Sequence, residues 1–411
     1  MFWRKTVNKN VDIASNAGLA GHRNIESNPL NKDTHRSLVR RVFAHLDAGT
    51  TDRAPDVLRN PVAVYTDPAR FEAEMAHILR SKSLLACLSG RLPGPGSYLA
   101  EDLAGVPVLL MRGEDGVARA FLNSCRHRGV RLLDGAGRVR RAFACPYHGW
   151  AYGADGHLKS VPHGDDFGEF DIAGCTLAVL PCTEADGMIW IRLSGEEPAD
   201  PGESLDGLAP ELGGYDLTGY HYYASSLMTP AINWKMAVDT FMEPYHFAVL
   251  HKQTVAPLFF PNLCLYDDFG RSFREYLPRR SIVEMRDNPE AEWDAVWHSA
   301  IIYYLPPNAI LVMQQDHVEL WRVYPRDGRV DRTEVYLDLY IPEPAESDSA
   351  RRHWDANLDL AVRTVETEDF AVAESAYAGF ATGLAKEVVY GRNEPALQAF
   401  HRRMAAEMAG L

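Results

Sequence analysis

The chain has 411 residues, a formal net charge of −14 and 46% hydrophobic residues. Its length allows roughly two or three domains, and its apolar content is sufficient for sizeable cores. The acidic excess argues against a general nucleic-acid-binding protein, because phosphate contacts need a basic surface. Since no run of about eighteen apolar residues occurs, neither a transmembrane helix nor a membrane partner is expected.

Residues 1–35 are polar and rich in asparagine, and we expect them to form a poorly ordered N-terminal tail. They lack the apolar stretch of a signal peptide, so a cytoplasmic location is predicted. Four of the six cysteines have no spacing typical of a disulfide framework. They are expected to be buried free thiols in a reducing compartment: Cys87, Cys175, Cys182 and Cys264.

Two helices are predicted in the next segment, over residues 37–46 and 67–79, with Asp67 as N-cap and Pro68 at the first helical position. After residue 83, short apolar stretches alternate with turns rich in Gly, Asp and Pro. This pattern indicates a small all-β domain. The predicted strands cover residues 84–88, 107–112, 118–122, 142–145, 177–181 and 188–192.

The second half of the chain mixes helices and strands, which indicates an α+β domain. A stretch rich in Pro, Gly and Asp at 198–214 reads as a linker. Helices are predicted over residues 234–250 and 349–382. Strands are predicted over residues 300–304, 309–315, 318–324 and 332–340.

Two short motifs in the β domain carry metal-binding side chains. The first is Cys125-Arg126-His127, and the second is Cys145-Pro146-Tyr147-His148. Two thiolates and two imidazoles complete a four-ligand site for zinc or for a Rieske [2Fe–2S] cluster. Zinc sites usually pair like ligands, whereas each motif here mixes sulfur and nitrogen. The mixed pairs favour the [2Fe–2S] cluster, in which each loop contributes to both irons.

A second metal site is predicted from His246 and His251. A mononuclear iron(II) site of the oxygenase type needs two histidines and one carboxylate on one face of the ion. A spacing of five residues places the two side chains about 140° apart on a regular helix. We therefore expect a broken or π-like turn near Pro244, which lacks a backbone donor.

The third ligand is predicted to be Asp369. It falls on the apolar stripe of the long C-terminal helix, while Glu368 lies about 100° away from it. A carboxylate on an apolar stripe needs a metal or a charged partner, so an ion pair with a buried arginine is the alternative. The stripe is expected to be formed by Leu358, Val362, Val365, Val372 and Ala376.

With these motifs, the chain resembles the α subunits of Rieske non-haem iron oxygenases. It does not resemble the Rieske proteins of respiratory complexes, because Val130 and Tyr147 stand near the positions of their extra cysteines. The resemblance implies an α+β fold, with a small all-β Rieske domain and a helix-grip catalytic domain built on an antiparallel sheet. It implies a [2Fe–2S] cluster on Cys125, His127, Cys145 and His148, and an iron ion on His246, His251 and Asp369.

The expected domain organisation follows from the resemblance and the linker. Residues 1–35 form the tail, residues 36–82 a helical segment that packs on the catalytic domain, residues 83–197 the Rieske domain, and residues 198–411 the catalytic domain.

The resemblance also implies a homotrimer, in which electrons pass between neighbouring subunits. Glu243 matches the carboxylate that binds a cluster histidine of the neighbour, so we expect it to bridge the subunits. Asp239 stands where many members have asparagine. A catalytic contribution of Asp239 is considered, but a solvated or ion-paired acid is the simpler interpretation.

The expected function is that of a terminal oxygenase component. It would use O2 and electrons from NAD(P)H, delivered by a separate reductase with or without a ferredoxin, to hydroxylate or dihydroxylate a small aromatic substrate. An O- or N-demethylase or a quaternary-ammonium monooxygenase is the alternative within the family. An electron-transfer Rieske protein without oxygenase activity is the alternative outside it. Possible pocket residues are Phe247, Leu250, Phe259, Phe260, Tyr303 and Met313.

Overall fold

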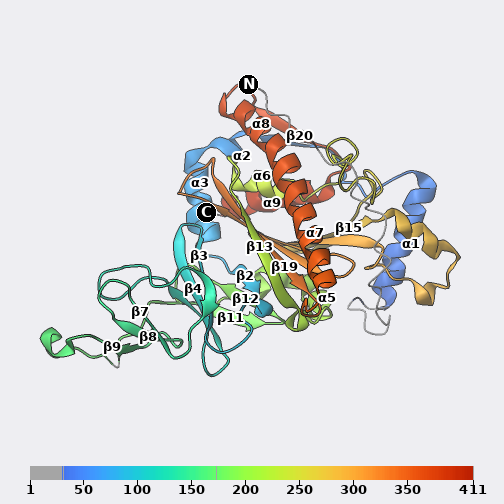
Figure 1. Ribbon diagram of the computed structural model, residues 1–411. Coiled ribbons are helices and arrows are strands. Elements are labelled where there is room, and N and C mark those ends of the chain that lie inside the picture. The colour runs from blue at the N-terminus through green and yellow to red at the C-terminus, as the bar shows by residue number, and fades with distance from the viewer. Residues whose placement is uncertain (1–29, 31, 173, 411) are drawn as a thin grey trace, which may run out of the picture.

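The computed structural model describes residues 30, 32–172 and 174–410 (Figure 1). Most of the predicted tail, residues 1–29 and 31, lies outside the described residues. For residues 32–35 the prediction of a poorly ordered tail is wrong, because helix α1 spans Lys32–Ala48 and His35 is only 3% exposed. The Ala295 amide donates to His35 Nδ1 and fixes the first turn of this helix. Among the described helices, none is long and apolar enough to cross a membrane.

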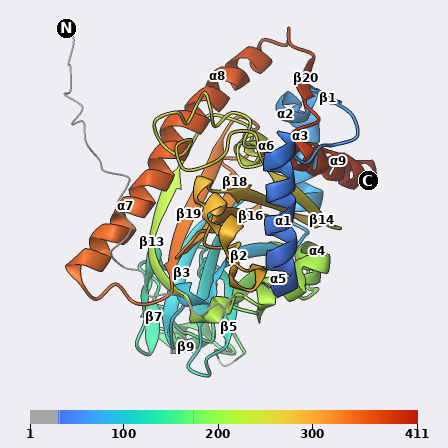
Figure 2. The same ribbon diagram turned by 90° about the vertical axis from the view of Figure 1, so that its right-hand side faces the viewer.

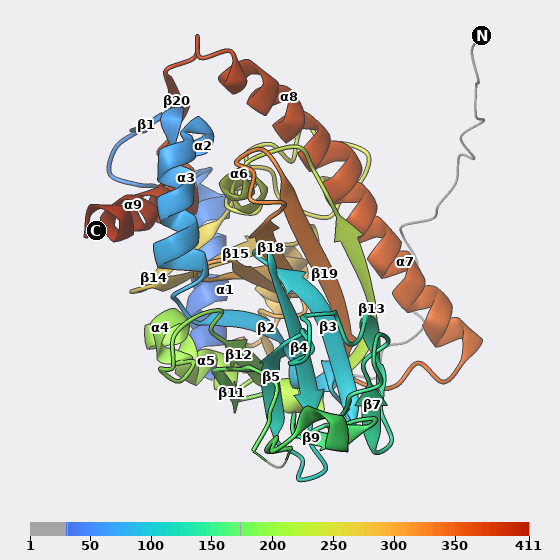
Figure 3. The same ribbon diagram turned by 90° about the vertical axis from the view of Figure 1, so that its left-hand side faces the viewer.

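The predicted Rieske domain consists of three small antiparallel sheets (Figure 3). The sequence pattern predicted six of these eleven strands. It missed residues 97–103, 135–138, 151–153, 158–160 and 182–185, which are short or interrupted by glycine and polar residues. The five-stranded sheet contains β10 (Val179–Leu180), β5 (Ala118–Leu122), β4 (Val106–Arg112), β3 (Ser97–Leu103) and β6 (Gly135–Arg138), in that order. The others contain β11 (Cys182–Ala185), β12 (Met188–Ile191) and β2 (Leu84–Leu88), and β7 (Ala142–Ala144), β8 (Ala151–Gly153) and β9 (Leu158–Ser160).

A seven-stranded antiparallel sheet forms the centre of the C-terminal half. Its middle strands are buried throughout, because helices and loops cover both faces. Ile302 and Val312 belong to one core, while Tyr303 and Met313 belong to the core on the opposite face. The strand order is β13 (His221–Met228), β19 (Thr333–Ile341), β18 (Val318–Pro325), β17 (Ala309–Met313), β16 (Ser299–Leu305), β15 (Ser272–Pro278) and β14 (Leu265–Phe269).

The predicted long helix is present but contains a π turn. Helix α7 (Asp348–Thr364) continues through the π turn η9 (Val365–Asp369) into α8 (Phe370–Ala381), and Figure 3 shows them as one rod beside the sheet. A π turn inserts one extra residue and rotates the remainder of the helix about its axis. The predicted buried position of Val372 is therefore wrong: Val372 is 52% exposed, and Ala373 is buried in its place.

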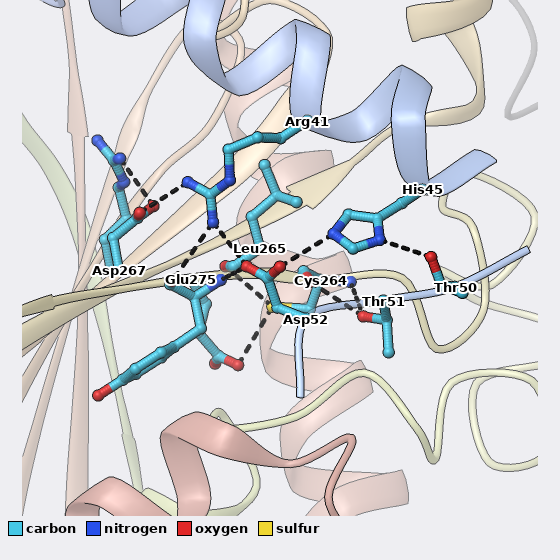
Figure 4. Close-up of polar contacts among 11 residues, drawn as sticks. Arg41, His45, Thr50, Thr51, Asp52, Cys264, Leu265, Asp267 and Glu275 are labelled. Carbon is cyan, nitrogen blue, oxygen red and sulfur yellow. Dashed lines mark hydrogen bonds and ion pairs between the residues drawn. The ribbon is translucent and has the colours of Figure 1, made fainter. Parts of the chain in front are cut away.

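Helix α1 packs on the face of the sheet opposite to α7 and α8 (Figure 2). Arg41 pairs with Asp52 and Asp267 at 2.6 and 2.7 Å, which ties the helix to strand β14 (Figure 4). The hydroxyl of Thr51 donates to the Cys264 carbonyl in the same region. The N-terminal helix is thus part of the larger domain. Nearby elements are β1 (Leu58–Pro61), paired with β20 (Glu387–Tyr390), and α2 (Ala63–Thr66), α3 (Pro68–Glu74) and α9 (Pro395–Ala409).

The four cysteines outside the metal motifs are all free, as predicted. Cys87 and Cys264 are buried, whereas Cys175 and Cys182 are only half-buried. Burial raises the pKa of the Cys87 and Cys264 thiols, which favours the uncharged form.

One buried ion-pair cluster connects the two halves of the chain. Arg322 on β18 is fully buried and donates to Glu101 on β3 at 2.7 Å and to Asp338 on β19 at 2.8 Å. Asp338 is fully buried as well, and Glu101 is 11% exposed. Because each buried charge depends on the others, this cluster holds the predicted Rieske domain against the catalytic sheet.

Replacing Arg322 with Met should lower the free energy of unfolding by about 3–5 kcal/mol, because Asp338 and Glu101 would be left as buried charges without their cation. Urea denaturation followed by cluster absorbance and tryptophan fluorescence would measure this loss. The matched control is Arg329→Met, which removes an exposed pair with Asp331 and should cost at most about 1 kcal/mol. If Arg322→Met and Arg329→Met lowered the free energy of unfolding equally, this would contradict the role of Arg322 in holding the two halves together.

Candidate metal centres

The segment before the candidate iron ligands is a short helix followed by turns. Helix α6 spans Trp234–Asp239 and is capped by Asn233, whose side chain accepts from the Lys235 amide. The prediction of a helix to residue 250 is wrong, because residues 240–250 form turns. Pro244 provides no backbone donor there. The predicted break in the helix is present, and it is what allows both histidines to face the same point.

Three side chains converge in this region: His246, His251 and Asp369. The Nε2 atoms of the two histidines lie 3.0 Å apart, and Asp369 Oδ1 lies 3.4 Å from His246 Nε2 and 3.1 Å from His251 Nε2. The three ligand atoms all lie within 4.8 Å of one another. This is the donor set of a 2-His-1-carboxylate iron(II) site.

Each of the two histidines is oriented by a carboxylate of its own, in addition to Asp369. Glu243 Oε1 lies 2.5 Å from His246 Nδ1, and Glu368 Oε2 lies 2.6 Å from His251 Nδ1. Thr254 donates to the same oxygen of Glu368 at 2.8 Å. A carboxylate on Nδ1 fixes the tautomer that presents Nε2 to a metal ion. The donor set and its supports therefore fit an iron ion.

The position of Glu368 beside His251 was not predicted from the sequence. A regular helix would place this residue away from the buried stripe, but the π turn directs both Glu368 and Asp369 toward the histidines. The signal in the sequence was the pair of neighbouring acids, Glu368 and Asp369, at the otherwise apolar stripe of the helix, which indicates that both side chains have a polar partner.

Electrostatics also favour a cation at this point. Burial raises the pKa of Asp369, despite the opposing effect of His251. Burial lowers the pKa of His251, but its contacts with Asp369 and Glu368 outweigh burial, and the net pKa is raised. Asp369 and His251 thus bind protons more readily when no metal ion is present, and a bound ion would displace these protons.

The two cysteine–histidine loops form the second centre. Cys125 and Cys145 are each 4% exposed, whereas His127 and His148 are half-buried. In the first loop the Gly129 amide bonds to the Cys125 carbonyl, and in the second the Gly149 amide bonds to that of Cys145. Both glycines have positive φ, of 74° and 71°, which favours glycine at these turns.

The loop side chains fit a [2Fe–2S] cluster. The His127 and His148 rings lie 4.5 Å apart, and His127 stacks on Trp150 at 4.8 Å. Within the described structure, His127 Nδ1 is buried without a hydrogen-bond partner. A buried ring nitrogen of this kind is costly unless it binds a metal. Tyr152 Oη lies 3.3 Å from Cys125 Sγ and could donate to a cluster thiolate.

A cavity of about 480 Å³ opens beside the candidate iron ligands. It is lined by His246, His251 and Asp369, and by the predicted pocket residues Phe247 and Phe259. Leu250 lines a smaller cavity, of about 250 Å³, on another side of His246 and Asp369.

Three predicted pocket residues do not line the larger cavity. Tyr303 and Met313 pack in the core on the far face of the sheet, because side chains alternate along strands and their neighbours Ile302 and Val312 face the cavity instead. Phe260 packs at the edge of that same far core. The assignment of these three residues was therefore wrong.

Two family models match this chain. "Rieske [2Fe-2S] domain" matches residues 82–180, and "Ring hydroxylating alpha subunit (catalytic domain)" matches residues 217–410. The chain belongs to the Rieske oxygenase α-subunit family. This assignment confirms the predicted class of protein, its α+β fold, and its two cofactors, a [2Fe–2S] cluster and a mononuclear iron.

Among the relatives of this α subunit, the glycine betaine monooxygenase oxygenase subunit of Chromohalobacter salexigens is 33% identical over 230 residues, which cover 54% of this chain and 50% of that protein. The carnitine monooxygenase oxygenase subunit of Escherichia coli K12 is 31% identical over 198 residues, covering 46% of this chain and 51% of the relative. The chain thus spans about half the length of the curated relatives it matches.

Solved structures support the fold of the α subunit. The quaternary ammonium Rieske monooxygenase CntA in complex with L-carnitine has a TM-score of 0.72 at 21% identity, covering 86% of this chain and 96% of that one. Naphthalene 1,2-dioxygenase from Rhodococcus sp. bound to indole has a TM-score of 0.66 at 19% identity, covering 93% and 99%. At these identities the likeness concerns the fold alone.

The predicted domain boundaries and the roles of the α subunit's site residues stay predictions. Asp239 is ion-paired, with its Oδ1 2.9 Å from His401 Nε2, and it also accepts from the Tyr65 hydroxyl. Glu243 contacts His246 of its own chain, and its role between subunits stays a prediction as well.

Replacing Asp369 with Ala should empty the mononuclear site and leave the cluster intact, because one of three ligands is lost. Glu368→Gln should keep the site but weaken iron(II) binding by about 10–100-fold, since the support of His251 Nδ1 is weakened. Iron titration and the cluster absorbance would measure both effects. The control is Glu366→Gln, an exposed acid in the same π turn, which should bind iron normally. Normal iron affinity in Glu368→Gln would refute the orienting role.

Proposed function

We propose that this chain is the terminal oxygenase component of a multicomponent Rieske system, which monooxygenates a small, charged organic substrate. The observation that carries the proposal is the convergence of His246, His251 and Asp369 at the wall of a 480 Å³ cavity. A metal ion held by three side chains keeps coordination positions for other ligands, and the cavity gives a substrate access to them.

When bound, the cluster supplies electrons and the iron ion supplies O2 activation. The protein's own side chains hold and orient these groups. Glu243 and Glu368 keep the Nε2 atoms of both histidines directed at the ion. Asp369 is buried, which limits the access of water to its carboxylate. The apolar side chains Phe247 and Val312 provide a dry surface beside the ligands.

The cavity favours the alternative substrate class, which includes quaternary-ammonium compounds, over the aromatic class that was expected first. One wall contains Arg279, Asp316 and Glu319, and an aromatic hydrocarbon has no group to bind such charges. Two of the relatives are named for glycine betaine and carnitine, which agrees with a charged substrate. Dihydroxylation of an aromatic compound is the second candidate, supported by the 2,4-dinitrotoluene dioxygenase relative at 30% identity.

The partners are proposed on chemical grounds. Neither metal centre takes a hydride from NAD(P)H, so a reductase, with or without a ferredoxin, must deliver single electrons. His127 and His148 are half-buried while the cysteines are buried, so the histidine side of the cluster faces the approach of a partner. A homotrimer, with Glu243 at the contact between subunits, is part of the same proposal.

Oxygen uptake by the reduced enzyme tests the proposed function. With NADH and a Rieske-type reductase, O2 consumption should rise with a quaternary ammonium compound and yield one oxidised product per O2, whereas Asp369→Ala should lose this coupling. No O2 consumption at all by the fully iron-loaded protein would favour an electron-transfer protein. A cis-diol formed from an aromatic substrate would establish the second candidate.

Complementation between subunits tests the trimer. A variant without the iron site, Asp369→Ala, mixed with a variant without the cluster, Cys145→Ala, should recover activity if electrons pass between subunits. Glu243→Gln should retain both metals but slow turnover by at least tenfold, in comparison with the exposed control Glu284→Gln. Full activity of a monomer in sedimentation experiments would refute the trimer.

A further inference from the structure

The cavity beside the iron ligands has an unusual polar wall, which neither the family assignment nor the proposed chemistry explains. Arg279 donates to Gln314 Oε1 at 2.7 Å, and Gln314 Nε2 donates to Glu319 Oε1 at 3.1 Å. His317 lies between Glu319 and Asp316, at 3.3 and 2.8 Å. All five side chains line the cavity. We call them the polar wall.

The two acids of the polar wall already have partners. Glu319 accepts from the Trp321 indole at 2.9 Å in addition to Gln314, and it lies near His317. Asp316 lies 2.8 Å from both His317 Nδ1 and His353 Nε2. Their hydrogen-bonding capacity toward a ligand is therefore largely used within the wall.

Arg279 differs from these acids, because its contacts are all with uncharged groups. Its side chain donates to the Ser299 carbonyl at 3.2 Å and to Gln314, and it lies over the Phe259 ring at 5.0 Å. Within residues 32–172 and 174–410, no carboxylate lies within 4.0 Å of its guanidinium. Burial lowers its pKa to about 10, so it remains charged at neutral pH. A cation in such a place lacks a directly bound counter-ion.

The position of Arg279 relative to the iron ligands sets the shape of a matching ligand. Two aromatic rings connect them through successive contacts: Phe247 contacts His251 with ring centroids 5.3 Å apart, and Phe259 contacts Phe247 at 5.9 Å. Phe259 in turn lies beneath Arg279. A molecule that reaches from the ion to the guanidinium must therefore cross an apolar surface.

We propose that Arg279 anchors a carboxylate group of the substrate, so that the reacting carbon, separated from the carboxylate by an apolar spacer, is held beside the iron ligands. This inference rests on the proposed function and narrows its substrate class to organic carboxylates. The planar guanidinium suits a carboxylate because it presents paired N–H donors. Fixed contacts at the remote end orient the reacting end without taking part in the chemistry.

A purely structural role for Arg279 would give a different pattern of effects. If its contacts with Ser299 and Gln314 only held the strand ends together, removing it would weaken the binding of every ligand alike. An anchor, in contrast, affects only ligands that carry the carboxylate. The difference in affinity between matched carboxylates and alcohols therefore separates the two roles.

The experiment uses the iron-loaded, cluster-containing protein and pairs of compounds that differ only in that group: glycine betaine with choline, γ-butyrobetaine with its alcohol, and benzoate with benzyl alcohol. Calorimetry gives the affinities, and the electron paramagnetic resonance signal of the iron(II)–nitric oxide adduct shows binding beside the ion. In at least one pair the carboxylate should bind at least tenfold more tightly than the alcohol. Arg279→Met should abolish this preference by weakening carboxylate binding about 10–100-fold, with alcohol binding unchanged.

Arg279→Gln keeps part of the hydrogen-bonding capacity without the charge, since its amide has two N–H donors and the guanidinium has five. It carries the same prediction if the Met variant loses its metals. Arg286→Met removes an exposed arginine that pairs with Asp47 and should leave the preference intact, which controls for net charge. A carboxylate preference that survives in Arg279→Gln, or that is absent from all three wild-type pairs, would overturn the anchor. Peroxide formation by the reduced enzyme without substrate reports O2 activation separately, so failure of the anchor and failure of the oxygenase proposal remain distinguishable.

Discussion

The catalytic half of this protein depends on one electrostatic arrangement, in which three carboxylates surround two histidines in a buried space. Asp369 meets both Nε2 atoms, while Glu243 and Glu368 occupy the Nδ1 atoms. Without a cation, this concentration of negative charge in a low-dielectric site is unfavourable, because buried like charges repel and desolvation penalises each of them. A divalent ion removes both penalties. The π turn and the broken segment after α6 are the backbone adjustments that make the arrangement possible.

The two metal centres differ in exposure in a way that suits their different tasks. The cluster cysteines are buried, but the cluster histidines are only half-buried, so the histidine side of the cluster is the more accessible one. In the other centre His251 and Asp369 are 2% and 6% exposed and His246 is half-buried, and a small molecule reaches the ligand atoms through the cavity beside them. The buried Arg322 cluster joins the sheets that carry these two environments, so it fixes the two halves of one chain relative to each other.

Much of this structure follows from local patterns that tertiary packing does not override. Four adjacent strands of the catalytic sheet, β16 to β19, and six strands of the predicted Rieske domain were predicted because apolar alternation and turn residues act over a few positions, whereas short or polar strands such as β6 and β14 were not. The metal ligands were predicted because soft and borderline donors at short spacing have few other uses. The errors about which side chains face inward share one physical origin, since a single inserted residue or a one-residue shift along a strand reverses these directions. Because of the π turn, Val372 is exposed and Glu368 faces the histidines. Because side chains alternate along strands, Ile302 and Val312 line the cavity, while Tyr303 and Met313 lie in the core on the other face of the sheet.

The polar wall lies in the same cavity as the aromatic side chains that led us to expect an aromatic substrate. Phe247 and Phe259 alone indicate an apolar pocket, and they do line the cavity. The charged residues of the wall come from other parts of the chain, which only the folded sheet brings together. An apolar surface discriminates weakly between similar molecules, whereas a buried charge left without its partner is costly. A mismatched ligand would therefore lose most binding energy at the few charged groups of this cavity, while the larger aromatic surface would limit mainly its size and shape.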